Sequence, residues 1–294
     1  MKNQIKYILF LLVGLVFSQG NFQILTIPSN TRMLSLSNAG YAMNNLVNSY
    51  DIGLFTAKEN ININLHSHLY PAGIFYLNTE IIIPFQKYSV LFSYANLNYG
   101  DFKDGELNYE FNSSEFLFKG AIKTQVLNKF SIGTSFNYAI NKISNQFSHA
   151  LLMSLGARTQ LENPRLGFGI SINNIGKIMD VLYHINEDIP ASLNLSTFYS
   201  PQYFPGILLL DISKFYNTSD LQIRAGIEIT INDYLLLRFG NSSNSFNLSD
   251  PYSSYFPGLS SGIGIKSKKW DIDIGFFNLE TAGIVTGLSL LYKK

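Results

Sequence analysis

Residues that could form an active site are few in this chain, and they lack the context that catalysis requires. Residues 258–262 read Gly-Leu-Ser-Ser-Gly and match the nucleophile pattern Gly-x-Ser-x-Gly. That pattern exposes its serine on a sharp turn between a strand and a helix. A glycine-rich strand pattern follows here, with no helix pattern after it. We therefore expect no catalysis at Ser260 and no enzyme.

Metal ligands are equally scattered. The four histidines are His66, His68, His149 and His184. They are too few and too far apart for a zinc site or a catalytic triad. Residues 241–250 are rich in Asn and Ser, but Asp250 is their only carboxylate, whereas calcium requires several anionic oxygen ligands. The sequence predicts no metal and no cofactor.

The glycines at 167, 169 and 176 lie on or beside an alternating strand pattern, with no helix pattern after them. A phosphate-binding glycine loop opens a helix. We expect these glycines instead to make room inside the fold.

The composition points toward a membrane. Charged residues make up 14% of the chain, against roughly 25% in ordinary globular proteins, and there are 23 Phe and 18 Tyr. The net charge of +1 argues against a nucleic-acid partner. No apolar run reaches the roughly 18 residues that a transmembrane helix requires.

Past residue 60 the side chains alternate, which is typical of strands with two unlike faces. In residues 129–141, Phe130, Ile132 and Phe136 share one face, and Ser131 and Gly133 share the other. A soluble β-sandwich would also alternate, but its polar face would be dense in charges. Here that face is mostly Gly, Ser, Asn and Thr, as in a crowded, wet barrel interior.

About fourteen such segments follow one another, most near the roughly 9 to 11 residues of a membrane-crossing strand. They are 61–67, 72–83, 87–97, 115–126, 129–141, 150–161, 164–173, 190–199, 206–216, 220–231, 233–240, 259–266, 269–277 and 284–292. The predicted fold is all-β: a transmembrane antiparallel β-barrel over residues 61–294.

The charges support this assignment because a Lys or Arg facing lipid at mid-bilayer costs about 2 to 4 kcal/mol. Only Lys214, near a strand end, shares the apolar face of its segment. The charges predicted to face the lumen are Lys119, Lys123, Arg158, Arg224, Glu228 and Arg238. Of these, Arg224, Glu228 and Arg238 are expected to be mutually paired structural ions or a selectivity feature.

Short connections alternate with longer ones near 98–114, 142–149, 174–189 and 241–258. Outer-membrane barrels pair short periplasmic turns with long extracellular loops, so both termini are predicted to be periplasmic. Aromatic residues in the long loops either dock protein partners or pack over the barrel mouth.

The first sixty residues precede the barrel. Residues 1–18 have the basic start and the apolar run of a signal peptide. Residues 19–60 contain an irregular stretch, 26–43, that is small and apolar enough to be buried, and irregular backbone at membrane depth must be buried in protein or line a cavity. We expect a hatch that plugs the lumen, with Arg32 paired to one carboxylate among Glu80, Glu228, Asp271 and Asp273.

The hatch also carries a resemblance. Its motif residues are Pro28, Arg32, Leu34, Leu36, Ala39 and Gly40. They resemble the amino-terminal signature of the PorV/PorQ family, and the modest chain length is nearer PorQ. Two departures are Asn38, where a glycine is common, and the absence of an Asn-Pro-Ala step around 48–55.

The resemblance implies a FadL-like outer-membrane barrel in a Gram-negative-type bacterium, with a role in type IX secretion. Its partners would be outer-membrane lipid and secretion or attachment proteins or their cargo, which it would help deliver at the cell surface. The alternative is a FadL-like transporter of hydrophobic small molecules.

Overall fold

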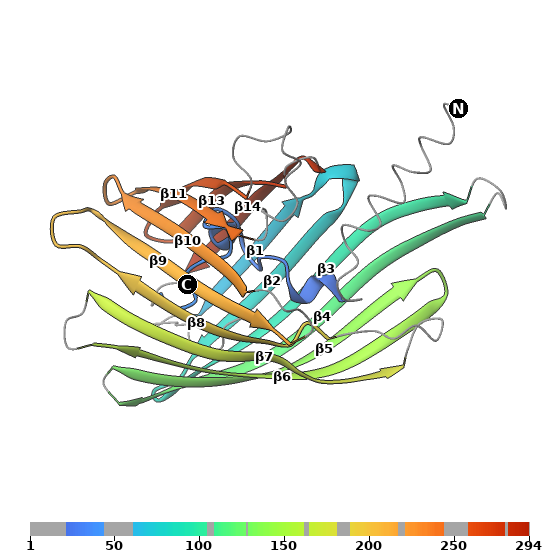
Figure 1. Ribbon diagram of the computed structural model, residues 1–294, viewed down its shortest axis with the longest axis horizontal. Coiled ribbons are helices and arrows are strands. Elements are labelled where there is room, and N and C mark those ends of the chain that lie inside the picture. Colours follow the sequence, from blue (N-terminus) through green and yellow to red (C-terminus); the bar gives the residue numbers. More distant parts are fainter. Residues whose placement is uncertain are drawn as a thin grey trace.

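The computed structural model is a closed antiparallel β-barrel of fourteen strands, in which β1 pairs with β14 to complete the ring (Figure 1). It describes residues 22–43, 61–104, 109–127, 129–161, 165–180, 189–216, 221–243, 258–279 and 282–293. The strands are β1 Asn62–Leu69, β2 Phe75–Pro84, β3 Tyr88–Asp104, β4 Tyr109–Leu127, β5 Phe130–Ile143, β6 Gln146–Gln160, β7 Leu166–Asp180, β8 Ser192–Tyr199, β9 Gly206–Phe215, β10 Leu221–Thr230, β11 Leu235–Ser242, β12 Ser260–Lys266, β13 Trp270–Asn278 and β14 Ile284–Lys293. The prediction of an all-β barrel is confirmed.

The alternation of the strands separates two faces. On β13, Trp270, Ile274 and Phe276 point outward and stay about 42 to 45% exposed, whereas Asp273 on the same strand is buried. Every strand repeats this arrangement, so the outer surface is a band of exposed aliphatic and aromatic side chains. Such a surface suits hydrocarbon rather than water. Within the described residues, no helix has the length and apolar character to cross a membrane.

The two rims of the barrel differ. We call the rim with the connections at 85–87, 200–205, 231–234 and 267–269 the short-turn rim, and the opposite one the loop rim. Exposed aromatics ring the short-turn rim: Phe85, Tyr88, Tyr199, Tyr203, Tyr234 and Trp270. Amphipathic aromatic rings favour the boundary between hydrocarbon and water, so this girdle marks one edge of the membrane-facing band.

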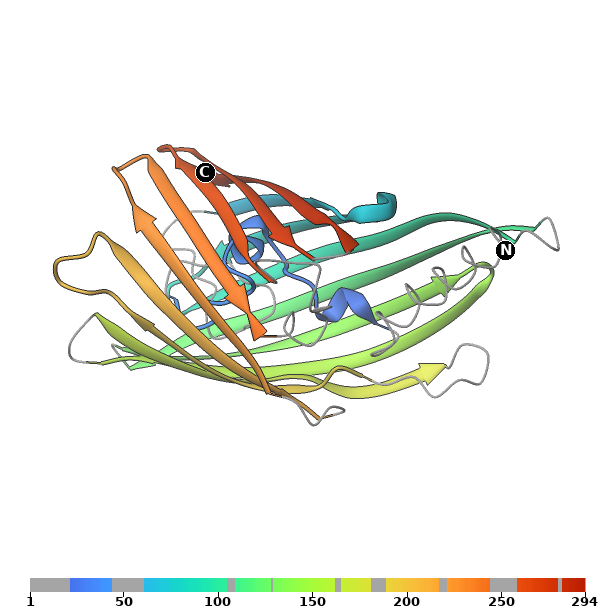
Figure 2. The ribbon, with the colours of Figure 1, turned by 45° about the horizontal axis from the view of Figure 1, so that its top comes forward.

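The barrel wall is taller on one side. Strands β3 and β4 have 17 and 19 residues, whereas β12 has 7, and Figures 1 and 2 show the green strands running far past the others. The long loops predicted at 98–114 and 142–149 are therefore wrong, because most of these residues continue the two hairpins. In the loop predicted at 174–189, β7 continues as far as Asp180, and 181–188 lie outside the described residues.

The alternation could not predict these extensions because their outer faces turn polar. Asn96 and Asn98 continue the outward row of β3, and Asn112 and Ser114 continue that of β4. Of the predicted loop aromatics, Phe102 and Phe111 stack across the extended hairpin with ring centroids 5.3 Å apart.

Residues 22–43, hereafter the inner segment, lie inside the barrel and are almost entirely buried (blue in Figure 2). The 3-10 turn η1 (Gln23–Leu25) contacts β3 and β4, and the short helix α2 (Thr31–Leu34) contacts β1 and β12 to β14. The side chain of Asn30 caps α2 by accepting a hydrogen bond from the Met33 N–H at 2.9 Å. The predicted signal peptide and residues 19–21 and 44–60 of the predicted hatch lie outside the described residues.

Candidate functional site: the barrel lumen

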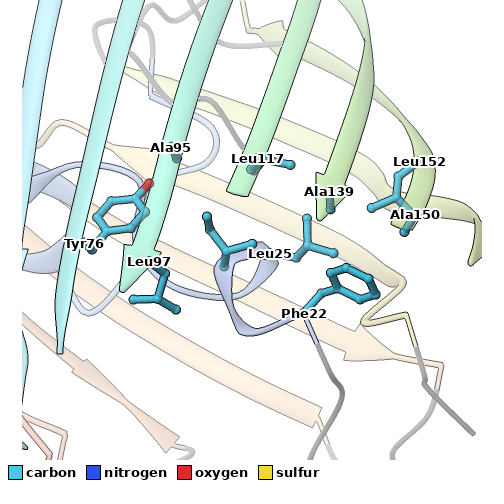
Figure 3. Close-up of a cluster of buried hydrophobic side chains, with 10 residues drawn as sticks. Phe22, Leu25, Tyr76, Ala95, Leu97, Leu117, Ala139, Ala150 and Leu152 are labelled. Atoms are coloured by element: carbon cyan, nitrogen blue, oxygen red, sulfur yellow. The ribbon is translucent and has the colours of Figure 1, made fainter. Parts of the chain in front are cut away.

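One side of the lumen is apolar. Three inner-segment side chains, Phe22, Ile24 and Leu25, pack against the inner faces of β2 to β6 (Figure 3). The wall residues of this apolar cluster are Tyr76, Ala95, Leu97, Leu117, Ala139, Ala150 and Leu152. Small alanines alternate with larger leucines along the wall, which leaves room for the inner segment against it. The sequence reasoning missed this cluster because the same residues would suit any inward-facing strand position.

A buried carboxylate fixes the inner segment beside that cluster. Glu115 on β4 accepts hydrogen bonds from the Ile24 N–H at 2.8 Å and from the Tyr99 hydroxyl at 2.6 Å. A buried carboxylate is tolerated only when its oxygens are hydrogen-bonded. Glu115 therefore determines where η1 lies, although no sequence pattern distinguishes it from other inward-facing polar residues.

The opposite side of the lumen is ionic. Arg32 of the inner segment donates two hydrogen bonds to Glu228 on β10, at 2.7 and 2.6 Å. Glu228 also accepts from Arg238 on β11 at 2.7 Å, and Arg238 donates to Asp273 on β13 at 2.6 Å. Two guanidinium groups thus balance two carboxylates. The expectation that Arg32 pairs with one of four carboxylates is confirmed, with Glu228 as its partner.

The other three carboxylates have different neighbours. Glu80 faces His66 at 3.6 Å, Asp271 pairs with Lys293 near the short-turn rim at 2.5 Å, and Asp273 is held by Arg238.

Inward-facing glycines make room for α2 and the residues after it. A Cβ at Gly287 would lie 2.7 Å from Leu34 Cδ2, and one at Gly275 would lie 3.0 Å from the Thr31 carbonyl oxygen. A Cβ at Gly240 would lie 2.7 Å from Leu36 Cα and nearer still to its carbonyl carbon. A backbone atom cannot rotate away from such a contact. Only glycine allows the inner segment to approach the wall this closely.

The end of the inner segment is held by charged wall residues. Asp211 on β9 accepts hydrogen bonds from the N–H groups of Gly40 and Tyr41, at 2.7 and 3.1 Å. Gly40 has a φ of 114°, a conformation that favours glycine. Arg158 on β6 donates to the Ala42 carbonyl oxygen at 2.5 Å. Arg224 on β10 lies 4.8 Å from the centre of the Tyr41 ring.

The structure therefore brings four of the six predicted lumen charges, Arg158, Arg224, Glu228 and Arg238, to the inner segment or its ionic partners. Lys119 and Lys123 are also buried on the inner face of β4. Lys214 is half-buried near the end of β9, on the same face as exposed Leu210 and Ile212.

Among the predicted hatch residues, Leu34, Leu36, Ala39 and Gly40 are buried, and Pro28 and Arg32 are half-buried. The residues that form the motif are thus largely those that dock the inner segment on the wall.

The weaker candidates from the sequence have structural roles. Ser260 of the Gly-x-Ser-x-Gly match donates to the Ser35 carbonyl oxygen at 2.8 Å and lies 2.8 Å from the Ser37 hydroxyl. A Cβ at Gly169 would lie 3.5 Å from Ala42 Cα, which fits the expected role of making room. Gly176 instead approaches the backbone of Leu152 beside an irregular pairing of β6 and β7.

A second polar group lies between β1, β2 and β14. His66 Nδ1 and the Ser289 hydroxyl are 2.7 Å apart, and Ser289 also accepts from the Thr31 N–H at 3.1 Å.

Burial raises the pKa of the nearby Tyr70 hydroxyl, which keeps that group neutral. No group of three or more His, Asp or Glu residues in the described part of the chain could hold a metal ion.

Comparisons with known proteins support the fold. No family model matches the chain, and no curated protein resembles it in sequence. The PorV/PorQ resemblance therefore has no support beyond the motif that carries it. Solved structures do match: the CymD monoaromatic hydrocarbon channel has a TM-score of 0.64 and 13% identity, and the alignment covers 93% of this chain and 99% of that one.

Two further solved structures match over nearly the whole chain. The Ralstonia pickettii toluene transporter TbuX has a TM-score of 0.63 at 12% identity, with 90% of this chain and 97% of that one covered. The P. putida toluene transporter TodX has a TM-score of 0.58 at 10% identity, with 91% and 98% covered. The chain thus has the FadL-like barrel fold of these channels.

Proposed function

We propose that this protein is an outer-membrane channel for small hydrophobic molecules. The observation that carries the proposal is the apolar cluster, which gives one side of the lumen a surface that a hydrocarbon can contact. Phe22 and Leu25 face Leu97, Leu117 and Leu152 there without an intervening charge pair. Specific channels for apolar cargo require such a surface, with a few polar groups that fix its geometry.

The ionic side of the lumen would serve a different purpose. The Arg32–Glu228–Arg238–Asp273 chain and the Asp211 contacts fasten the inner segment on the side away from the apolar cluster. A segment fastened there keeps a water-filled pore from forming, while a path along the apolar side can open by small movements of η1. In this proposal the inner segment acts as the hatch that its sequence predicted.

The likeness to hydrocarbon channels supports the same function. Those channels share the barrel over at least 97% of their own lengths. This chain contains an apolar surface inside that shared barrel. Both termini would lie on the periplasmic side, as the alternation of short and long connections predicted.

Uptake of labelled toluene by an outer-membrane-permeability reporter strain tests the proposal. Cells that produce the protein should take up toluene saturably and faster than cells without it. The Leu25→Asn variant places an amide in the apolar cluster and should reduce that uptake several-fold, whereas Leu25→Met keeps the volume and the apolar character and should retain it. Equal uptake with and without the protein would refute a hydrocarbon channel.

Delivery of secretion cargo remains the second candidate, and the hatch motif is the observation that favours it. Arg32, Leu36 and Gly40 all contact the wall, so docking of the inner segment accounts for them equally well in a channel. Copurification separates the two functions. Stoichiometric capture of secretion-machine components with the tagged chain, together with unchanged toluene uptake on its deletion, would favour cargo delivery.

A further inference from the structure

The outer face of the tall wall contains a hollow that is separate from the lumen. The hollow has a volume of about 740 Å³. Most of its outward-facing lining comes from β3 to β6 and includes Phe92, Tyr94, Phe118, Phe136, Tyr138 and Leu151. Ile81 on β2 and Ile175 on β7 also line it. Behind them, the inward-facing Lys119 and Asn137 belong to the wall that forms its floor. A volume of this size falls in the roughly 300 to 1,000 Å³ range of small-molecule sites.

A missing side chain creates the hollow. Gly120 on β4 pairs with Phe92 on β3 and with Phe136 on β5. A Cβ at Gly120 would have only Phe92 Cε1 within reach, at 4.0 Å, so the space above it is open. Phe136 is 67% exposed and Phe92 is 56% exposed, and both stand at the edges of that space. The row of large outward side chains is interrupted at this one position of β4.

The hollow lies at the loop-rim edge of the membrane-facing band. The outward row of β3 runs through Phe92 and Tyr94 and then turns polar at Asn96. The hollow is therefore surrounded by the hydrocarbon of the bilayer and reaches the level at which lipid head groups begin. Whatever fills it enters from the membrane side.

Two lysines lie at the same loop-rim edge of the membrane-facing band. Lys177 on β7 is exposed and pairs with Leu151, which lines the hollow. Lys142 continues the outward row of β5 beyond Tyr138, toward the loop rim. The Tyr138 hydroxyl and His149 Nδ1 lie 2.8 Å apart between these two lysines, and the acidic Asp180 follows farther along β7. A lysine at a membrane boundary attracts an anionic head group.

We propose that this hollow binds one acyl chain of an anionic membrane phospholipid, with the lipid phosphate at Lys177. The chain fills the space above Gly120 between the Phe92 and Phe136 rings. The phosphate forms an ion pair with the Lys177 ammonium at the water boundary, and Lys142 adds to the positive field. This is a lipid site on the outer face of the wall and is independent of any path through the lumen.

Photo-crosslinking in vesicles tests the site. The purified protein is reconstituted in phosphatidylcholine that contains a small fraction of phosphatidylglycerol with a diazirine in one acyl chain, and labelled peptides are mapped by mass spectrometry. We expect labelling to concentrate on β4 and β5 around Phe118 and Phe136. Gly120→Leu fills the hollow and should reduce that labelling about tenfold, whereas Ala225→Leu places a leucine on the lipid-facing side of β10 and should leave it unchanged.

A separate variant tests the contact between the lipid head group and Lys177. Lys177→Gln should reduce labelling by phosphatidylglycerol about threefold to fivefold without changing labelling by a phosphatidylcholine probe of the same chain. A heat-modifiable gel band verifies that each variant is folded. Labelling that is equal on β4 and β10, or that survives Gly120→Leu, would overturn the site.

The hollow could instead be filled by a second copy of the chain or by channel cargo, and the result expected for either one overturns the proposal. Crosslinked dimers in place of lipid adducts would assign the hollow to a second copy of the chain. Displacement of the probe by toluene would assign it to channel cargo. Toluene uptake by the Gly120→Leu variant is measured in parallel, so failure of the lipid site and failure of the channel function are told apart.

Discussion

Arg32 and Glu228 hold the inner segment through the strongest kind of contact in the lumen. A bidentate arginine–carboxylate pair is directional and charge-assisted, and here Arg238 and Asp273 extend it. The desolvation of four charges offsets much of their attraction, so the network fixes the position of the segment more than it adds net stability. Removal of one partner destabilises the protein, because the remaining charge stays buried without its counter-charge.

Replacement of Glu228 by Gln should therefore be costly. It leaves the guanidinium groups of Arg32 and Arg238 facing an amide, and breaking a buried pair in this way destabilises a protein by about 3 to 5 kcal/mol. Urea-induced unfolding from phosphatidylcholine vesicles measures the loss. The control is Glu110→Gln, because Glu110 pairs with Lys103 on an exposed part of the hairpin. Equal free energies of unfolding for the two variants would contradict the role of the network.

The residue scale also shows what spacing could and could not predict. Parity along a strand predicted that Glu228 and Asp273 face inward, and composition predicted that a buried Arg32 requires a carboxylate. Neither parity nor composition could identify which of the four carboxylates pairs with Arg32. That depends on where the closed barrel places each carboxylate relative to the inner segment. Glu115 and Asp211 were missed because each accepts backbone N–H groups of the inner segment, a contact that leaves no pattern in the sequence.

At the scale of elements, the strands were predictable because each has one face in hydrocarbon and one in the packed lumen. All fourteen predicted segments coincide with strands, from β1 at Asn62–Leu69 to β14 at Ile284–Lys293. The prediction of loops failed at the ends of β3 to β7. On β3 and β4 the outward face turns polar, so the contrast between the two faces that alternation detects is lost. On β7 the irregular pairing with β6 beside Asn174 interrupts the alternation. The hairpin contact between Phe102 and Phe111 is too short a pattern to reveal the extension.

The inner segment depends on glycines in the strands that it crosses. Gly240→Ala should push Leu36 and its neighbours away from β11, because the added Cβ would overlap the Leu36 backbone. The chain has no cysteine, so one introduced at Ser37, which is buried, reports this movement. A maleimide reagent should leave Ser37→Cys unlabelled in the parent barrel and should label it when Gly240→Ala is added.

Gly120→Ala provides the matched control for this experiment. It adds the same methyl group on the outer face, where only Phe92 Cε1 comes within 4.0 Å. Ser37→Cys combined with Gly120→Ala should stay unlabelled. Labelling in both backgrounds, or in neither, would show that the glycines are not what allows the inner segment to dock.

At the scale of the whole molecule, the barrel is asymmetric both in the length of its strands and in the kind of side chains that contact the inner segment. Strands β3 to β6 form part of the tall wall, carry most of the apolar cluster on their inner face and bear the hollow on their outer face. The shorter strands β9 to β14 carry the ionic contacts and the glycines under α2. The side with β9 to β14 thus holds the ion-pair network of the inner segment, and the taller side has apolar surfaces on both its inner and its outer face.

A barrel of this size without its inner segment should conduct ions, since a wall of about fourteen strands encloses more space than its own side chains fill. Deletion of residues 22–43, with residue 21 joined to residue 44, should raise single-channel conductance in planar bilayers well above that of the full chain. Detergent-extracted protein with a heat-modifiable band shows that the deletion variant has folded.

A variant in which the inner segment is cross-linked to the wall is the counterpart of the deletion. Ser37→Cys with Ser260→Cys places two thiols where hydroxyl oxygens lie 2.8 Å apart, so oxidation should tie the inner segment to β12 by the chain's only disulfide. The oxidised variant should keep the low conductance of the full chain while the deletion variant conducts. If both conduct alike, the lumen is open beside the inner segment, and the segment does not close it. If neither conducts, the wall side chains alone fill the lumen, and the ionic network has a structural role only.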